Sequence, residues 1–248
     1  MKKFSSLLHN LILTPSRNTK IKLLQDYFKT LDINRAYALA ILSDQLSFQF
    51  IKASKLRELV YEQVDQHLFD YSYDYVGDLA ETISLIWPTN TEGKSQNLST
   101  LIENIKKIKK SEINTEFSKV LSELSNNERW TLIKICTGGL RIGVSERLVK
   151  TALADLYNKS VNEIEEIWHG LEFPYENLFQ WLKNETSKPK IDFKKLFHPM
   201  MLANPIDEEK DFKRLDANEF QAEYKWDGIR VQLMVSSKSV SLYSRTGD

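Results

Sequence analysis

The residues best suited to covalent chemistry lie in the run Glu223-Tyr224-Lys225-Trp226-Asp227-Gly228-Ile229-Arg230. A lysine amine attacks a phosphorus centre only when it is deprotonated, and burial or neighbouring cations favour that form. Because the turn formers Asp227-Gly228 follow directly, we expect Lys225 at the end of a strand, with Glu223 and Arg230 within reach. Such an arrangement suits an amine aimed at a nucleotide phosphate. The alternative is an ordinary hairpin turn with a solvated lysine.

A second candidate site is the segment 137–149, which holds three of the eight glycines of the chain. Ser145 is expected to cap a helix that begins after it. Exposed backbone N–H groups beside a helix N-terminus and Arg141 could bind an anion. The alternative is a plain helix–loop–helix corner whose glycines serve tight turns.

Hydrophobic periodicity predicts an all-α domain of about ten helices from Phe4 to about Glu185. The segment 137–149 lies within this domain, and the run around Lys225 follows it. Thr19, Asn34 and Ser54 are expected to open early helices, and Val76 to Ile86 to form one that Trp87-Pro88 ends. A polar loop is expected at 89–97. Further helices are predicted at 98–110, 112–125, 127–136, 145–157, 160–170 and 174–186.

The pattern changes after Thr186, where Ser187-Lys188-Pro189-Lys190 indicates a linker. Apolar residues then alternate from Ile229 to Val235 and again from Val240 to Ser244, which predicts a β-hairpin. A hairpin is not stable alone, so the second domain is expected to be incomplete or to need a partner. The predicted boundaries are a helical domain at 1–187, a linker at 188–197 and the start of a second domain at 198–248.

Composition narrows the class of protein. The chain has 248 residues, 42% of them hydrophobic and 27% charged, which is typical of globular protein. The single cysteine, Cys136, excludes an intramolecular disulfide framework. The N-terminal leucines favour an amphipathic helix over a secretory signal, and no apolar run is long enough for a membrane span. We therefore expect a cytoplasmic protein without a membrane partner.

Net charge is zero, but the charges are segregated along the chain. Residues 1–60 hold ten Lys/Arg and four Asp/Glu, whereas residues 61–93 hold seven acidic residues and no Lys or Arg. One face can therefore be basic while another is acidic, and a polyanion partner is not excluded. Arg17, Lys20 and the lysines at 106–110 could contact phosphates, although such residues more often form a solvated face.

Two sets of motifs resemble a known family. Residues 223–230 resemble the nucleotidyltransferase signature shared by ATP-dependent DNA ligases, RNA ligases and mRNA capping enzymes, and Ser244-Arg245-Thr246-Gly247 resembles the next motif. Leu140 to Ser145 resembles a motif in the helical DNA-binding domain of ATP-dependent DNA ligases, and 198–203 resembles the entry to their adenylation domain. RNA ligases and capping enzymes lack that leading helical domain. The chain thus resembles the N-terminal portion of an ATP-dependent DNA ligase.

The resemblance implies a mainly α fold, with the helical domain followed by the first β-hairpin of an α+β adenylation domain. It also implies that Lys225 attacks the α-phosphate of ATP to form lysyl-AMP, with Mg²⁺ as the metal. Glu223 would read the adenine amino group, while Arg230 and Arg245 would bind the ribose or a DNA phosphate. No metal ligand is assigned within residues 1–248, because the later motifs of the family are missing from this stretch.

The same resemblance implies nicked duplex DNA as the partner of a monomeric ligase, located at the nucleoid if the cell is bacterial or archaeal. The residues expected to contact DNA are Gly138, Gly139, Arg141, Gly143 and Ser145, together with the weaker candidates Arg17 and Lys20. Residues 1–248 alone are expected to bind DNA without catalysing ligation. The alternatives are another lysine nucleotidyltransferase, such as an RNA ligase or capping enzyme, and a non-catalytic helical DNA-binding module.

Overall fold

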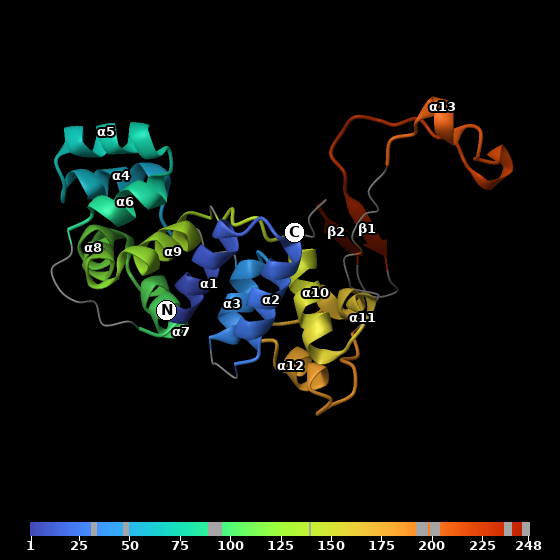
Figure 1. Ribbon diagram of the computed structural model, residues 1–248, viewed down its shortest axis with the longest axis horizontal. Helices are drawn as coiled ribbons and strands as arrows, with labels where there is room; N and C mark the ends of the chain where they lie inside the picture. The colour runs from blue at the N-terminus through green and yellow to red at the C-terminus, as the bar shows by residue number, and fades with distance from the viewer. Residues whose placement is uncertain are drawn as a thin grey trace. The chain divides into compact units, whose positions relative to one another are not determined.

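The computed structural model describes residues 1–30, 34–46, 50–88, 96–138, 140–191, 198, 204–235 and 240–244 (Figure 1). The chain forms two compact units. One comprises Met1–Glu165 and Glu172–Lys188, and the other comprises Glu166–Leu171 and Pro189–Asp248. The domain boundaries expected from the sequence stay a prediction.

The first unit is helical, as the sequence predicts, and its described residues contain no strand. Its helices are α1 (Lys2–Leu13), α2 (Arg17–Phe28), α3 (Arg35–Leu42), α4 (Ala53–Tyr61), α5 (Gln66–Val76), α6 (Leu79–Ile86), α7 (Leu98–Lys106), the 3₁₀ turn η1 (Lys110–Glu112), α8 (Ile113–Glu123), α9 (Asn126–Thr137), α10 (Glu146–Tyr157) and α12 (Glu176–Leu182), and α11 (Val161–Trp168) begins in it.

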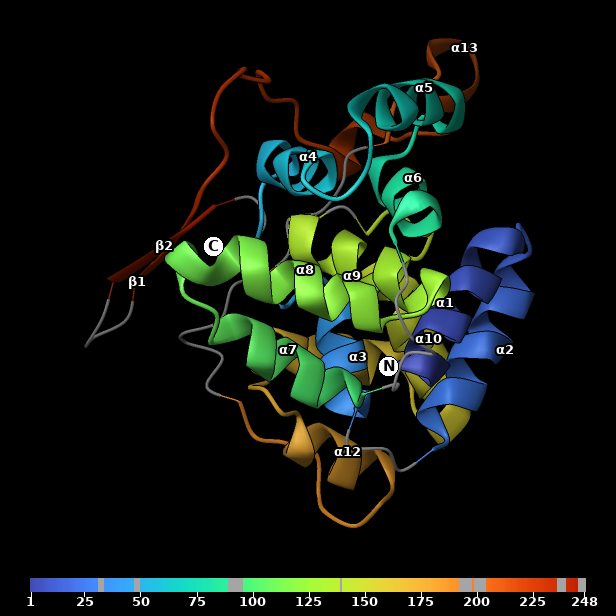
Figure 2. The same cartoon turned by 90° about the vertical axis from the view of Figure 1, so that its left-hand side faces the viewer.

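Helices far apart in the sequence pack together in this unit. Helix α1 lies against α2 and α9, α10 packs on α2, and α6 packs between α5 and α9 (Figures 1 and 2). Phenylalanine and leucine side chains fill the interior, and Phe4, Phe28, Phe69, Phe117 and Phe179 are all fully buried or nearly so. Burial of such side chains provides most of the stability of the helices.

Local capping explains where several helices begin. Ser16, and not Thr19, caps α2, because its hydroxyl accepts a hydrogen bond from the Thr19 N–H. The expected single helix from Val76 to Ile86 is wrong. Gly77 adopts a left-handed conformation (φ +76°) that ends α5, and the Asp78 carboxylate caps α6 by accepting from the Glu81 N–H. Helix α4 starts at Ala53, one residue before the expected Ser54.

One buried arginine joins three helices. The guanidinium of Arg129, in α9, donates hydrogen bonds to the carbonyl oxygens of Ser84 in α6, Leu121 in α8 and Leu124 at the end of α8. Its side chain is fully buried, and burial lowers its pKa to about 10, which leaves it charged at neutral pH. Arg129 thereby satisfies carbonyl groups that helix ends leave unpaired.

The second unit contains little regular structure among the residues described. Its elements are helix α13 (Glu208–Asp211), the 3₁₀ turn η3 (Ala217–Glu219) and strands β1 (Gln232–Val235) and β2 (Val240–Tyr243). The strands pair antiparallel, with Gln232 opposite Tyr243 and Val235 opposite Val240. The predicted hairpin is confirmed, while its expected turn at 237–239 lies outside the described residues.

Candidate functional site

Lys225 lies in an exposed segment that forms neither helix nor strand. Residues 221–230 are all exposed, and β1 begins only at Gln232, so the expectation that Lys225 ends a strand is wrong. A strand forms where a neighbour accepts its backbone hydrogen bonds, and β2 reaches only as far as the four residues of β1. The described residues therefore do not bury the Lys225 amine.

The side chains expected to act with Lys225 are nearby in sequence but are not assembled around it. Glu223 and Arg230 are exposed, and neither forms a hydrogen bond or salt bridge with Lys225. The flanking rings of Tyr224 and Trp226 have centroids 6.2 Å apart. Arg245 lies outside the described residues. Glu223, Lys225 and Arg230 have side chains suited to nucleotide chemistry, but they do not form an enclosed site.

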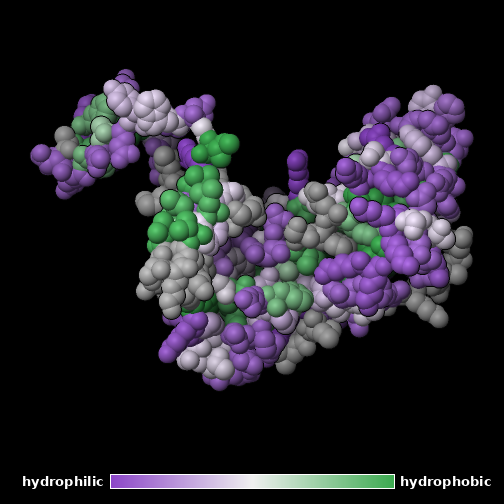
Figure 3. All heavy atoms as spheres, turned by 180° about the vertical axis from the view of Figure 1, so that it is seen from behind, coloured by the Kyte–Doolittle hydropathy of each residue, from purple (hydrophilic) through white to green (hydrophobic). Residues whose placement is uncertain are grey.

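The hairpin after Lys225 carries an exposed apolar face. Leu233 and Leu242 pair across the strands, as do Val235 and Val240, and all four are exposed. Figure 3 shows hydrophobic side chains gathered over the hairpin. The side-chain amide of Gln232, which the sequence pattern did not single out, holds the backbone of His198 through two hydrogen bonds of 2.7 and 2.9 Å.

The glycine-containing loop in the helical unit is anchored at both ends. Gly138 ends α9 in a left-handed conformation, and its N–H donates to the carbonyls of Ile135 and Lys134. Ile142 is buried, whereas Arg141 and Gly143 are exposed. Ser145 caps α10, as predicted, by accepting a hydrogen bond from the Leu148 N–H. Gly139 lies outside the described residues.

Helices α2 and α10 bring their N-termini to one surface cavity. The cavity has a volume of about 450 Å³ and is lined by Pro15, Arg17, Lys20, Gly143, Val144, Ser145 and Leu148. Four of the seven residues predicted to bind DNA therefore lie together, although they come from segments more than a hundred residues apart. Helix N-termini carry partial positive charge, and Arg17 is exposed beside them.

Lys20 connects the two segments that line this cavity. Its ammonium donates hydrogen bonds to the carbonyl oxygens of Gly143 (2.9 Å) and Ile142 (3.4 Å). Gly143 has a φ of +65°, and a Cβ atom built there would lie 2.7 Å from the Lys20 nitrogen. Glycine at 143 therefore permits both the backbone conformation and the close approach of the lysine. Sequence spacing carried no signal for this contact.

Comparisons with known proteins agree on one family. The family described as "DNA ligase N terminus" matches residues 1–154, and "ATP dependent DNA ligase domain" matches residues 200–248. This chain belongs to the DNA ligases. It is 35% identical over 134 residues to a DNA ligase of Nitrosopumilus maritimus, which is 52% of this chain and 23% of that protein. It is 32% identical over 138 residues to a probable DNA ligase of Koribacter versatilis, with 52% and 22% covered.

Each of the two matched regions contains one of the two candidate sites. The cavity between α2 and α10 lies within the ligase N-terminal region, and Lys225 lies within the ATP-dependent ligase region. The chain corresponds to the N-terminal portion of an ATP-dependent DNA ligase, and its matches span less than a quarter of the length of these relatives.

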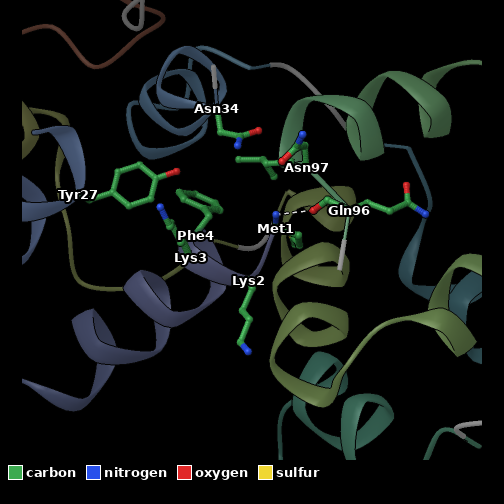
Figure 4. Close-up of a pocket in the computed structure, with 9 residues that line it drawn as sticks. Met1, Lys2, Lys3, Phe4, Tyr27, Asn34, Gln96 and Asn97 are labelled. Atoms are coloured by element: carbon green, nitrogen blue, oxygen red, sulfur yellow. Dashed lines mark hydrogen bonds between the residues drawn. The ribbon is translucent and has the colours of Figure 1, made fainter. Parts of the chain in front are cut away.

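A different cavity of this ligase chain is part of its helical framework. It has a volume of about 250 Å³ and lies where α1, α3 and α7 begin (Figure 4). The Met1 ammonium donates to the Gln96 carbonyl at 2.5 Å, and the Asn34 side chain accepts from the Ser99 N–H at the start of α7. These contacts tie three helix N-termini together.

The described part of the chain contains neither a cluster of metal-ligating side chains nor a membrane-spanning helix. No group of three or more His, Cys, Asp or Glu side chains is arranged to hold a metal ion there. None of the helices described is both long and apolar enough to cross a membrane.

Proposed function

We propose that this chain is the part of an ATP-dependent ligase that grips nicked duplex DNA and supplies the lysine nucleophile for sealing. The observation that carries the DNA-binding part is the cavity where Arg17, Gly143 and Ser145 meet at the N-termini of α2 and α10. Family membership supports the sealing chemistry.

The proposed DNA contact is a phosphate contact. A phosphate oxygen at the cavity would face the partial positive charge of two helix N-termini and the guanidinium of Arg17. The nearby carboxylate of Glu146 forms a 2.5 Å salt bridge with Lys150, so its charge is partly neutralised. Arg141 is exposed on the adjoining loop, where it could reach the same backbone. Such contacts position DNA without reading its sequence.

The proposed chemistry at Lys225 has three steps. The amine attacks the α-phosphorus of ATP, so that a P–N bond forms, a P–O bond breaks and pyrophosphate leaves. An oxygen of the 5′-phosphate at the nick then attacks the AMP phosphorus, so that a P–O bond forms, the P–N bond breaks and the lysine amine is restored. Finally the 3′-hydroxyl attacks the 5′-phosphate, so that the phosphodiester forms and AMP leaves. Glu223, Arg230 and Arg245 would orient the nucleotide. Mg²⁺ would neutralise phosphate charge when bound.

We also propose that residues 1–248 do not perform the first step alone. Lys225, Glu223 and Arg230 are of suitable types for a nucleotide, but all three are exposed and do not surround one. Phosphoryl-type transfer depends on positioning and charge neutralisation, which an open segment provides poorly. We further propose that the ligase acts as a monomer in the cytoplasm, and at the nucleoid if the cell is bacterial or archaeal.

Nick sealing by the ligase that contains this chain tests the proposal. With a labelled nicked duplex and ATP, we expect Lys225→Ala to abolish sealing and Lys213→Ala, an exposed lysine of the same unit, to leave it unchanged. Residues 1–248 should bind the duplex but take up no label from α-labelled ATP. Sealing by the Lys225→Ala enzyme, or labelling by GTP in place of ATP, would contradict the assignment.

A further inference from the structure

Helix α5 exposes an apolar and aromatic face that the ligase chemistry does not use. Leu68, Tyr71 and Tyr75 are 54%, 75% and 92% exposed, and their spacing of three and four residues places them on one side of the helix. We call these three residues the α5 face. Tyrosine is enriched at protein interfaces, where it contributes large contact area with little loss of side-chain entropy.

The opposite side of α5 is firmly packed. Phe69 is fully buried, and its ring lies 5.5 Å from that of Tyr61 and 5.9 Å from that of Tyr73. The guanidinium of Arg57 in α4 stacks 4.5 Å above the Tyr73 ring. The α5 face is therefore presented on a helix held in place from behind, which lowers the entropic cost of binding a partner.

The surroundings of the α5 face are acidic. Residues 61–88 hold six Asp or Glu and no Lys or Arg. Asp78 forms a salt bridge with Lys134, but Glu62, Asp65, Asp70 and Asp74 form none with the described residues. Asp74, three residues after Tyr71 on α5, borders the face. Asp70 lies on the α4 side of the helix, where its carboxylate accepts a 3.0 Å hydrogen bond from the Tyr61 hydroxyl. Such a surface repels DNA phosphates and attracts cations.

We propose that the α5 face docks a basic segment of another protein, one that carries Lys or Arg side chains around apolar anchors. The anchors would cover Leu68, while cations would lie over the tyrosine rings and beside Asp74. The choice of a basic partner rests on charge complementarity, because residues 61–88 hold six Asp or Glu and no Lys or Arg. The ligase would thereby engage a protein and DNA through separate surfaces of the same helical unit.

The test uses residues 1–248 and a fluorescent synthetic helical peptide with a leucine stripe flanked by Lys and Arg. We expect saturable binding that shifts backbone amide NMR signals of residues 66–76. The double variant Tyr71→Ser/Tyr75→Ser should weaken binding at least about tenfold, because truncating central aromatic contacts removes most interface energy. The control Phe212→Ser removes an aromatic ring that is 62% exposed elsewhere in the chain and should leave affinity unchanged.

Three results would overturn the proposal. The first is unchanged affinity in the double variant. The second is equal binding of a peptide whose leucines are replaced by glutamine, since attraction would then be purely electrostatic. The third is self-association through α5 in sedimentation, which would make a second copy the occupant. DNA affinity of the double variant should equal that of the unaltered chain, so failure here and failure of the DNA-binding proposal are separable.

Discussion

At the scale of single residues, Arg17 is the side chain whose proposed contact with DNA is easiest to isolate. It is exposed at the first position of α2 and lines the cavity at Gly143 and Ser145. Each phosphate contact that is lost lowers the slope of log affinity against log salt by about 0.9. We expect Arg17→Ala to weaken binding of residues 1–248 to duplex DNA and to reduce that slope by about one contact.

Fluorescence anisotropy across a range of salt concentrations measures both effects. Lys119→Ala provides the control, because Lys119 is an exposed lysine of α8 outside this cavity. An unchanged salt slope in Arg17→Ala would mean that Arg17 does not contact phosphate.

The buried side chain of Arg129 is expected to contribute strongly to the free energy of unfolding of the helical unit. Arg129→Met would leave the carbonyls of Ser84, Leu121 and Leu124 without their partner, and each buried unsatisfied acceptor costs roughly 1–3 kcal/mol. We expect the free energy of unfolding to fall by about 3–5 kcal/mol in urea titrations followed by circular dichroism. Arg147→Met, at an exposed arginine, should cost less than about 0.5 kcal/mol. A loss below about 1 kcal/mol at Arg129 would show that water replaces its hydrogen bonds.

At the scale of elements, the loop between α9 and α10 is expected to bind DNA only in the conformation that Gly143 allows. Gly143→Ala and Gly77→Ala should each lower stability by about 1 kcal/mol, because both glycines have positive φ. Only at 143 does the new Cβ meet another group, the Lys20 ammonium. We therefore expect Gly143→Ala alone to weaken DNA binding.

The pair of variants separates backbone strain from loop placement. Thermal melts should show a similar fall in melting temperature for both variants. Fluorescence anisotropy with labelled duplex should show weaker DNA binding for Gly143→Ala only. Equal DNA affinities in the two variants would remove the loop from the interface.

Element prediction from sequence succeeded where apolar side chains recur at helical spacing. The sequence predicts Ser145 as the cap of α10, because a serine stands directly before a periodic run. Hydrophobic periodicity does not predict helix α5, since its apolar residues are interrupted by acids and tyrosines and only Phe69 is buried. The strand expected to end at Lys225 does not form, because β2 pairs only with residues 232–235. A sequence period of two cannot show whether a partner strand is present.

At the scale of the whole molecule, the segregated charges expected from the sequence correspond to different surfaces of the helical unit. The basic N-terminal stretch contributes Arg17 and Lys20 to the cavity, and the acidic stretch forms α5 and its borders. What sequence could not show is the meeting of residues 17–20 with residues 143–148. That contact depends on the packing of α10 against α2, which no local pattern encodes.

The most direct test of the central claim is the position of the nucleotide on the adenylated enzyme. The ligase containing this chain is incubated with ATP and Mg²⁺ in the absence of DNA, digested under conditions that preserve the phosphoramidate, and mapped by mass spectrometry. We predict AMP on Lys225 and on no other lysine, and its loss when nicked duplex is added. AMP on another residue, or adduct that nicked DNA does not discharge, would contradict the assignment of Lys225 as the ligase nucleophile.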